Sequence, residues 1–199
     1  MSAFKCELCG NTDLKSGAVI KFGNYHGATD WRVLAVEGNK ALVISQQCLD
    51  RQPYSKDNSD TTWEKSYIRS WLNSDFINDA FSKDEQEKIL ESDVPADRIP
   101  THASLPGNPT KDKVFLLSYP EAEKYLPTEY LRRCKPTAYA VEKGTVMDGY
   151  ESSWWWLRSP GLFQNYGGRV YFGGKMGVEF SAPACNYSGV RPAMWINID

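Results

Sequence analysis

The chain has 199 residues, of which 41% are hydrophobic and 24% charged, as is usual for a globular protein with one core. Its net charge of −2 gives no electrostatic basis for nucleic-acid binding, and no apolar run reaches the roughly 18 residues of a membrane span. The N-terminus lacks an apolar signal segment and the five cysteines form no dense framework, so we expect reduced thiols and a cytoplasmic protein.

The first 16 residues form a short segment with a candidate zinc knuckle. Cys6 and Cys9 stand two residues apart, a spacing at which two thiolates can bind one metal from a tight turn. A structural zinc site takes four ligands, and the chain has no second such pair. We therefore name Cys6 and Cys9 as candidate zinc ligands, either completed across a dimer or left as a relic that binds nothing.

Strand patterns follow the N-terminal segment. Between the strand patterns at Trp31–Val36 and Lys40–Ser45 stands Glu37-Gly38-Asn39. These residues tolerate the positive φ of a tight turn, which predicts a hairpin over Trp31–Ser45. A connecting loop with Pro53 comes next, over Gln46–Thr62. The expected strands are Ala18–Phe22, Trp31–Val36 and Lys40–Ser45.

The middle of the chain changes to a helical period. Ile68, Trp71 and Leu72 fall on one helical face, and Ser82 with Glu85 forms a capping-box pattern, so we predict helices within Ser66–Leu90. These helices are expected to cover one side of the sheet.

A proline-rich stretch, Glu91–Lys113, follows and predicts an irregular surface loop. The apolar run Val114–Leu117 predicts a buried strand over Val114–Ser118. Pro120 is placed to begin a helix, and we expect helices within Pro120–Lys143.

The last third of the chain, Ser153–Ile198, is expected to hold the remaining strands. Three adjacent tryptophans, Trp154 to Trp156, must alternate faces in a strand, so at least one face anchors a core. Arg158 and Arg191 each stand near a proline among aromatics, which suits either a planar partner or backbone carbonyls, the structural role being the simpler interpretation. Two further strands joined by a Gly-rich turn are expected within Gly167–Phe180.

The motifs of this region resemble those of an uncharacterised bacterial and phage domain family related to the C-type-lectin-like fold. That fold also includes formylglycine-generating enzymes and the variable proteins of diversity-generating retroelements. The resemblance implies one α+β domain over residues 17–199, with a C-type-lectin-like core of mostly antiparallel short strands and flanking helices, and it implies no activity. It rests on the sequences WWWLRSPG at 154–161, GGRVYFGG at 167–174 and GVRPAMW at 189–195, and on earlier stretches at 20–34 and 67–73.

No catalytic constellation can be assembled from the sequence. Phosphate loops, dinucleotide fingerprints and the HExxH and GxSxG motifs are absent, and the chain has only two histidines. Cys134 stands between basic residues, but on a helix such neighbours point in different directions, which favours an inert thiol. We assign no catalytic residue and favour a non-catalytic module that recognises a ligand or a protein.

Two other functions are left open by the resemblance. One is a metal- or thiol-dependent enzyme of the formylglycine-generating type that uses Cys185, although such relatives hold copper with a pair of cysteines where this sequence offers only one. The other is a structural or assembly protein of a phage or mobile element.

The candidate contact residues lie in two C-terminal loops and the strand between them. Each loop pairs Asn with Tyr, residue types that recognition loops favour, although both loops also suit ordinary turns. In C-type-lectin-like relatives diversified by retroelements the ligand surface comes from the final part of the chain. The resemblance therefore implies contact residues in this part, whereas four others are expected to support the scaffold from behind: Trp156, Arg158, Arg191 and Trp195. The corresponding contact candidates are Asn165, Tyr166, Arg169, Tyr171, Asn186 and Tyr187.

Overall fold

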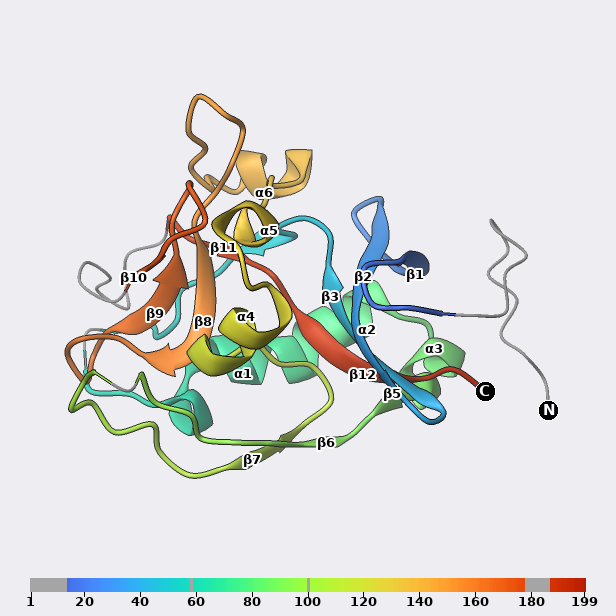
Figure 1. Ribbon diagram of the computed structural model, residues 1–199, viewed down its shortest axis with the longest axis horizontal. Coiled ribbons are helices and arrows are strands. Elements are labelled where there is room, and N and C mark those ends of the chain that lie inside the picture. Colours follow the sequence, from blue (N-terminus) through green and yellow to red (C-terminus); the bar gives the residue numbers. More distant parts are fainter. Residues whose placement is uncertain (1–13, 58, 100, 178–186) are drawn as a thin grey trace.

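The computed structural model describes residues 14–57, 59–99, 101–177 and 187–199 (Figure 1). Within these residues the protein has mixed α/β content with mostly antiparallel strands. The first sheet has the strand order β1-β2-β3-β12-β5. Its strands are β1 (Val19–Tyr25), β2 (Ala28–Glu37), β3 (Lys40–Ser45), β12 (Ala193–Asn197) and β5 (Ile89–Leu90).

The second sheet has the order β10-β9-β8-β11-β4. In it β11 runs parallel to β8, with Gly189 paired to Trp155, and the other strand pairs are antiparallel. Its strands are β10 (Met176–Gly177), β9 (Gly167–Val170), β8 (Trp155–Pro160), β11 (Gly189–Val190) and β4 (Asp50–Arg51). A separate antiparallel pair is formed by β6 (Ser92–Val94) and β7 (Thr110–Asp112).

The helices are short, and one continuous run of them passes behind β12 in Figure 1. This run consists of α1 (Tyr67–Trp71), the π-helical turn η2 (Leu72–Phe76) and α2 (Ile77–Ala80), preceded by the 3₁₀ turn η1 (Trp63–Lys65). The others are α3 (Lys83–Lys88), α4 (Tyr119–Tyr125), α5 (Glu129–Arg132) and α6 (Ala138–Glu142). In the described part of the chain, none of the helices has the length and apolar character needed to cross a bilayer.

Local sequence signals account for several of these boundaries. The hairpin predicted over Trp31–Ser45 is confirmed, because Trp31 pairs with Ser45 across β2 and β3. The Ser82–Glu85 capping box is also confirmed, with each residue bonded to the other's backbone N–H at the start of α3. Proline lies in the first turn of α4, where its missing N–H leaves no hydrogen bond unmade.

Two segments differ from expectation. Val114–Ser118 is fully buried, but in the described structure it pairs with a strand only where Phe115 meets Ala193, so it is not a sheet strand. Other groups bond its backbone instead. The amide side chain of Asn73 bonds the N–H and the carbonyl of Val114, and the N–H of Arg158 donates to the carbonyl of Leu117. Glu91–Lys113 is not irregular throughout, because β6 and β7 pair near its two ends.

The chain before β1 already contacts the folded part. Leu14 packs against the core, and the hydroxyl of Ser16 donates to the carbonyl of Leu34 at 2.9 Å. Cys6 and Cys9 of the candidate zinc knuckle lie outside the described residues.

Strand β8 is buried on both faces. The indole N–H of Trp155 donates to the carbonyl of Arg132 at 2.9 Å, and that of Trp156 donates to the carbonyl of Gln52 at 3.0 Å. The alternation of the strand sends the two rings to opposite sides, and both are fully buried. Each large ring therefore fills a different part of the core.

The two arginines of the C-terminal motifs are buried and bonded within the protein. Arg158 donates to the carbonyl of Leu116 at 3.0 Å and forms ion pairs with Asp97 and Glu121. Arg191 donates to the carbonyl of Ser45 at 3.0 Å and lies over the ring of Trp155. Both have the contacts that a structural role requires.

Truncation of Trp156 tests how far the fold depends on β8. We expect Trp156→Ala to lower the free energy of unfolding by about 3–5 kcal/mol, because it leaves a large cavity and an unpaired carbonyl at Gln52. Tyr150→Ala, at a highly exposed ring, is the control and should change it by about 0.5 kcal/mol or less. Urea denaturation measures both values, and equal losses would contradict a core role for Trp156.

Candidate recognition surface

The predicted contact residues separate into groups along β8. The loop that follows this strand holds Asn165 and Tyr166, whereas Tyr187 precedes β11, which pairs with the first residue of β8. A strand rises about 3.3 Å per residue, so the two ends of the six-residue β8 lie roughly 17 Å apart. The two loops therefore belong to different ends of the sheet and form two surfaces rather than one (Figure 1).

Arg169 is not a surface residue. Its side chain is only 3% exposed, with the guanidinium 4.0 Å from the ring centre of Trp154 and 5.1 Å from that of Tyr171. A planar cation between aromatic rings supports them from below. Arg169 thus supports the surface near Tyr171, itself half-buried, and does not reach a partner directly.

The remaining candidates differ in exposure. Tyr187 is 51% exposed, and its ring lies 5.8 Å from the guanidinium of Arg51. Asn165 and Tyr166 are half-buried. Asn186 lies outside the described residues, as does Cys185.

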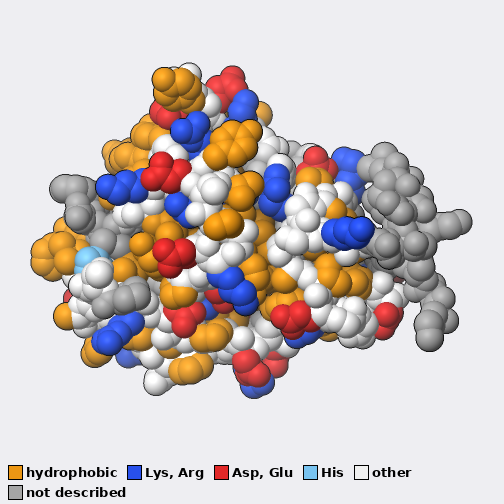
Figure 2. Space-filling view, viewed as in Figure 1, with side chains coloured by type: hydrophobic (Ala, Val, Ile, Leu, Met, Phe, Trp, Pro, Cys, Tyr) orange, Lys and Arg blue, Asp and Glu red, His pale blue; other side chains and the backbone are white. Residues whose placement is uncertain are grey.

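Apolar side chains gather at the end of the sheet where β8 finishes. Leu105 is 66% exposed, Leu162 39% and Phe163 56%, and we call these three residues the loop-end surface. Phe163 meets the ring of Tyr166 edge-on, with 5.1 Å between ring centres. Figure 2 shows hydrophobic side chains gathered at the left edge of the molecule, where these loops lie in Figure 1.

Gln164 holds the loops of this surface together. Its amide nitrogen donates to the carbonyls of Thr61 and Leu105, at 3.0 and 2.9 Å, and its amide oxygen accepts from the N–H of Leu105 at 2.8 Å. A further bond joins the hydroxyl of Ser104 to the carbonyl of Leu162 at 3.0 Å. The Gln164 amide thus acts as a fixed clamp between the loops.

The opposite end of β8 also exposes aromatic rings. Tyr130 and Tyr150 are highly exposed, and the N–H of Val146 donates to the carbonyl of Tyr187. A salt bridge between Lys135 and Glu151 lies in the same part of the chain. These aromatics come from α5, from the loop after α6 and from the residues before β11, so they are spread over several segments.

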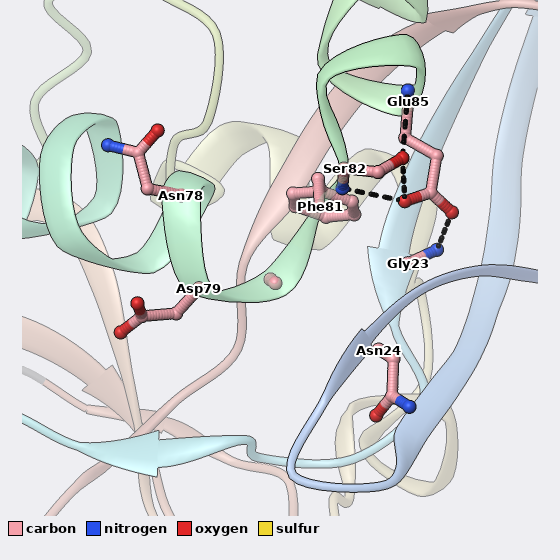
Figure 3. A pocket seen from close by; sticks show the side chains of 8 residues that line it. Gly23, Asn24, Asn78, Asp79, Phe81, Ser82 and Glu85 are labelled. Atoms are coloured by element: carbon pink, nitrogen blue, oxygen red, sulfur yellow. Dashed lines mark hydrogen bonds between the residues drawn. The ribbon is translucent and has the colours of Figure 1, made fainter.

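A shallow hollow of about 400 Å³ lies between β1 and the start of α3. Figure 3 shows its polar groups: the Glu85 carboxylate accepts hydrogen bonds from Ser82 and from the N–H of Gly23, while Asn78 and Asp79 stand apart from it. The carboxylate is already used to cap α3 and to attach β1. The hollow is therefore a structural junction, not an arrangement suited to chemistry.

A buried polar network lies under α6. The Tyr25 hydroxyl donates to the carboxylate of Asp50, which is only 1% exposed. Burial and this hydrogen bond raise the pKa of Tyr25 far above its ordinary value, so the phenol stays a donor. His26 stacks on Tyr139, with 3.6 Å between ring centres, and together these contacts attach the β1–β2 turn to β4 and α6.

No local sequence signal pointed to this network, because its members come from separate parts of the chain. Its carboxylate is enclosed by the tyrosine that bonds it, so it does not face a substrate. Over residues 14–57, 59–99, 101–177 and 187–199 the structure shows no group of three or more His, Cys, Asp or Glu that could hold a metal.

The fold and this surface define a mixed α/β, mostly antiparallel domain whose exposed loops are held by a rigid sheet. Residues 38–198 match the family model described as "Domain of unknown function (DUF6273)", so the protein belongs to this family. No curated protein and no solved structure matches the chain significantly.

The Glu85 junction leads to a prediction about pH. Burial raises the pKa of Glu85, but the hydrogen bonds from Ser82 and Gly23 outweigh it and bring the pKa below its ordinary value. The stability that this carboxylate contributes is therefore present above the ordinary value of about 4.3 and is lost as pH falls through the lower folded value. Glu85→Gln should be less stable than wild type at pH 6, and the gap should narrow by pH 3.

Urea midpoints at the two pH values measure this gap. The control is Glu87→Gln, on the exposed side of the same helix. A gap that stays constant or widens towards pH 3 would contradict the assigned role.

Removal of the Gln164 amide tests the clamp. We expect Gln164→Ala to lower the free energy of unfolding by about 1–2 kcal/mol, since each lost hydrogen bond contributes about 0.5–1.5 kcal/mol. Amide exchange at Leu105 should become faster, because the bond from its N–H is lost. Thr101→Ala, exposed in the same segment as Leu105, is the control, and unchanged exchange at Leu105 would show that the clamp is unimportant.

Proposed function

We propose that this protein is a non-catalytic recognition module that binds a partner protein through the loop-end surface of Leu105, Leu162 and Phe163. The observation that supports this most is the combination of apolar exposure with a fixed backbone. Large apolar side chains exposed together on a folded domain are characteristic of interaction sites. Here they come from two loops that Gln164 and Ser104 bond to each other.

The clamp favours binding because it reduces the ordering that association requires. Loops that are already fixed lose little conformational freedom when a partner arrives, so more of the contact energy appears as affinity. Phe163 is the natural anchor, since its ring is exposed and is oriented by the edge-on contact with Tyr166. Buried aromatic anchors carry much of the energy of protein interfaces.

A protein is a better match for this surface than the other partner classes. A small molecule needs a concave site that encloses most of its surface, whereas these loops lie at the edge of the molecule (Figure 1). A nucleic acid needs a basic stripe, and the chain has a net charge of −2. The surface instead offers apolar side chains beside backbone groups, which suits a partner with an apolar patch.

The C-type-lectin-like resemblance supports the same proposal. Such a core would place late loops of the chain on a rigid sheet, where their side chains can vary without disturbing the interior. The Phe163–Tyr166 loop lies late in the chain, directly after β8. We extend the proposal to a C-type-lectin-like core for residues 17–199.

Paired surface variants test the proposal. The double variant Leu105→Ser/Phe163→Ser should weaken binding of a partner by more than tenfold, because it removes the apolar anchors while leaving the clamp intact. Tyr130→Ser/Tyr150→Ser, at the opposite end of β8, is the matched control and should bind as wild type does. Candidate partners come from capture with the wild-type protein, and titration calorimetry then measures each dissociation constant.

Single tyrosine variants then locate the interface. Tyr166→Ala should weaken binding, since this ring orients Phe163, whereas Tyr187→Ala at the other end should not. Thermal melting confirms that each variant is folded. Loss of binding in Tyr187→Ala or in the control pair, with full binding by Leu105→Ser/Phe163→Ser, would assign the interface to the other end and refute the proposal.

A further inference from the structure

Two cysteines that are far apart in sequence lie on adjacent segments of backbone. The N–H of Cys48 donates to the carbonyl of Lys135 at 2.9 Å, and the N–H of Thr137 donates to the carbonyl of Cys48 at 2.9 Å. This parallel bridge places the loop that connects β3 to β4 beside the loop that connects α5 to α6. Cys134 completes the contact, with its sulfur 3.8 Å from the carbonyl oxygen of Gln46.

Both thiols are reduced and buried, and their side chains are hydrogen-bonded to each other. Burial raises the pKa of Cys48 well above its ordinary value, and its hydrogen bond with Cys134 raises it further. For Cys134 burial acts in the same direction, but the hydrogen bond with Cys48 and the charge of Arg191 outweigh it and lower the pKa. The first proton therefore leaves the pair at a lower pH than it leaves an ordinary thiol, and the second leaves at a higher pH.

Arg191 supplies positive charge beside this pair. Its side chain is buried, its Nε donates to the carbonyl of Ser45, and its Nη1 has no hydrogen-bond partner in the described structure. An unpaired buried guanidinium atom is costly to maintain. A thiolate at Cys134 would provide the missing negative charge, because the charge of Arg191 acts on both sulfurs.

We propose that Cys48 and Cys134 form a redox-active dithiol that hydrogen peroxide converts to a disulfide, with Arg191 stabilising the reacting thiolate. Nothing in this inference depends on the recognition surface. Support comes from the adjoining backbone segments, from the hydrogen bond between the two thiols and from the Arg191 nitrogen that has no hydrogen-bond partner in the described structure.

The reaction proceeds in two displacements. The Cys134 thiolate attacks one peroxide oxygen, the O–O bond breaks, and the hydroxide that leaves takes the proton of Cys48 to become water. The Cys48 thiolate then attacks the sulfur of the Cys134 sulfenic acid, forming the S–S bond and releasing hydroxide. Counted from two neutral thiols, one peroxide is reduced to two waters and the dithiol is oxidised by two electrons.

The disulfide would join two loops that are far apart in the sequence, the one between β3 and β4 and the one between α5 and α6. Closing so long a loop restricts the unfolded chain and stabilises the folded one. Gly189 of β11 packs directly on Cys48, so close that an added Cβ would lie 2.6 Å from the Cβ of Cys48. The oxidised form would therefore fix β11 as well as the two connecting loops.

Peptide mapping of the full chain tests the proposal. Folded protein treated with one equivalent of hydrogen peroxide should yield a Cys48–Cys134 linked peptide, and its melting temperature should rise by about 10 °C. Dithiothreitol should reverse both changes. Cys185→Ser controls for the other thiols and should behave as wild type.

Variants separate the roles of the two cysteines. In Cys48→Ser the sulfenic acid at Cys134 should persist and be trapped by dimedone, whereas Cys134→Ser should trap at least tenfold less at Cys48. Arg191→Lys should keep more of the wild-type oxidation rate than Arg191→Met, with the pH at half-maximal rate higher in Arg191→Met. Circular dichroism checks that each variant is folded.

Two outcomes would overturn the proposal. One is oxidation of other cysteines without any Cys48–Cys134 linkage in the folded protein. The other is a linkage that forms only after unfolding in urea, because the folded geometry would then have no part in it.

Discussion

The structure depends on one crossing point, where the chain passes between its two main sheets. The N–H of Ser45, at the end of β3, donates to the carbonyl of Pro192 at 2.9 Å, just before β12. Arg191 returns the contact by donating to the carbonyl of Ser45, and its guanidinium lies 5.0 Å from the ring centre of Trp155. Because β3 leads on to β4 and β11 leads on to β12, both chain segments change sheets here. A buried arginine is suited to this place, since its planar fork can bond a carbonyl while its face packs on an indole.

This crossing also determines which segments around β8 reach the surface. It holds β11 against the start of β8, and β8 is buried on both faces, so its side chains are unavailable to solvent. Only the loops at the ends of the strand remain exposed. One end presents Leu105, Leu162 and Phe163 on loops clamped by Gln164, and the other presents Tyr187 and its neighbours. In the recognition role that we propose, the clamped end would have the lower entropic cost of association, which is the physical reason for preferring it.

The family match and the fold do not begin at the same residue. The match starts at residue 38, yet β1 and β2 both precede it and form the edge of the first sheet. Strand β2 pairs with β3 from one end of β3 to the other, from Trp31 opposite Ser45 to Glu37 opposite Lys40. Without these strands β3 would be an exposed edge with unpaired backbone groups. The N-terminal strands thus complete the sheet that the matched region begins.

Sequence alone determined the features that depend on neighbouring residues. The Trp31–Ser45 hairpin follows from a turn signal between alternating strands, the start of α3 from Ser82 and Glu85, and the opposite burial of Trp155 and Trp156 from strand alternation. Tertiary structure decided everything that joins distant residues. The apolar pattern before Ser118 predicts a strand over Val114–Ser118, but the backbone there is bonded mainly by an asparagine side chain and by other segments. The Gln164 clamp, the Cys48–Cys134 pair and the separation of Tyr166 from Tyr187 were equally invisible, because propensity and periodicity describe a residue's near neighbours, whereas these contacts depend on which segments the folded sheets bring together.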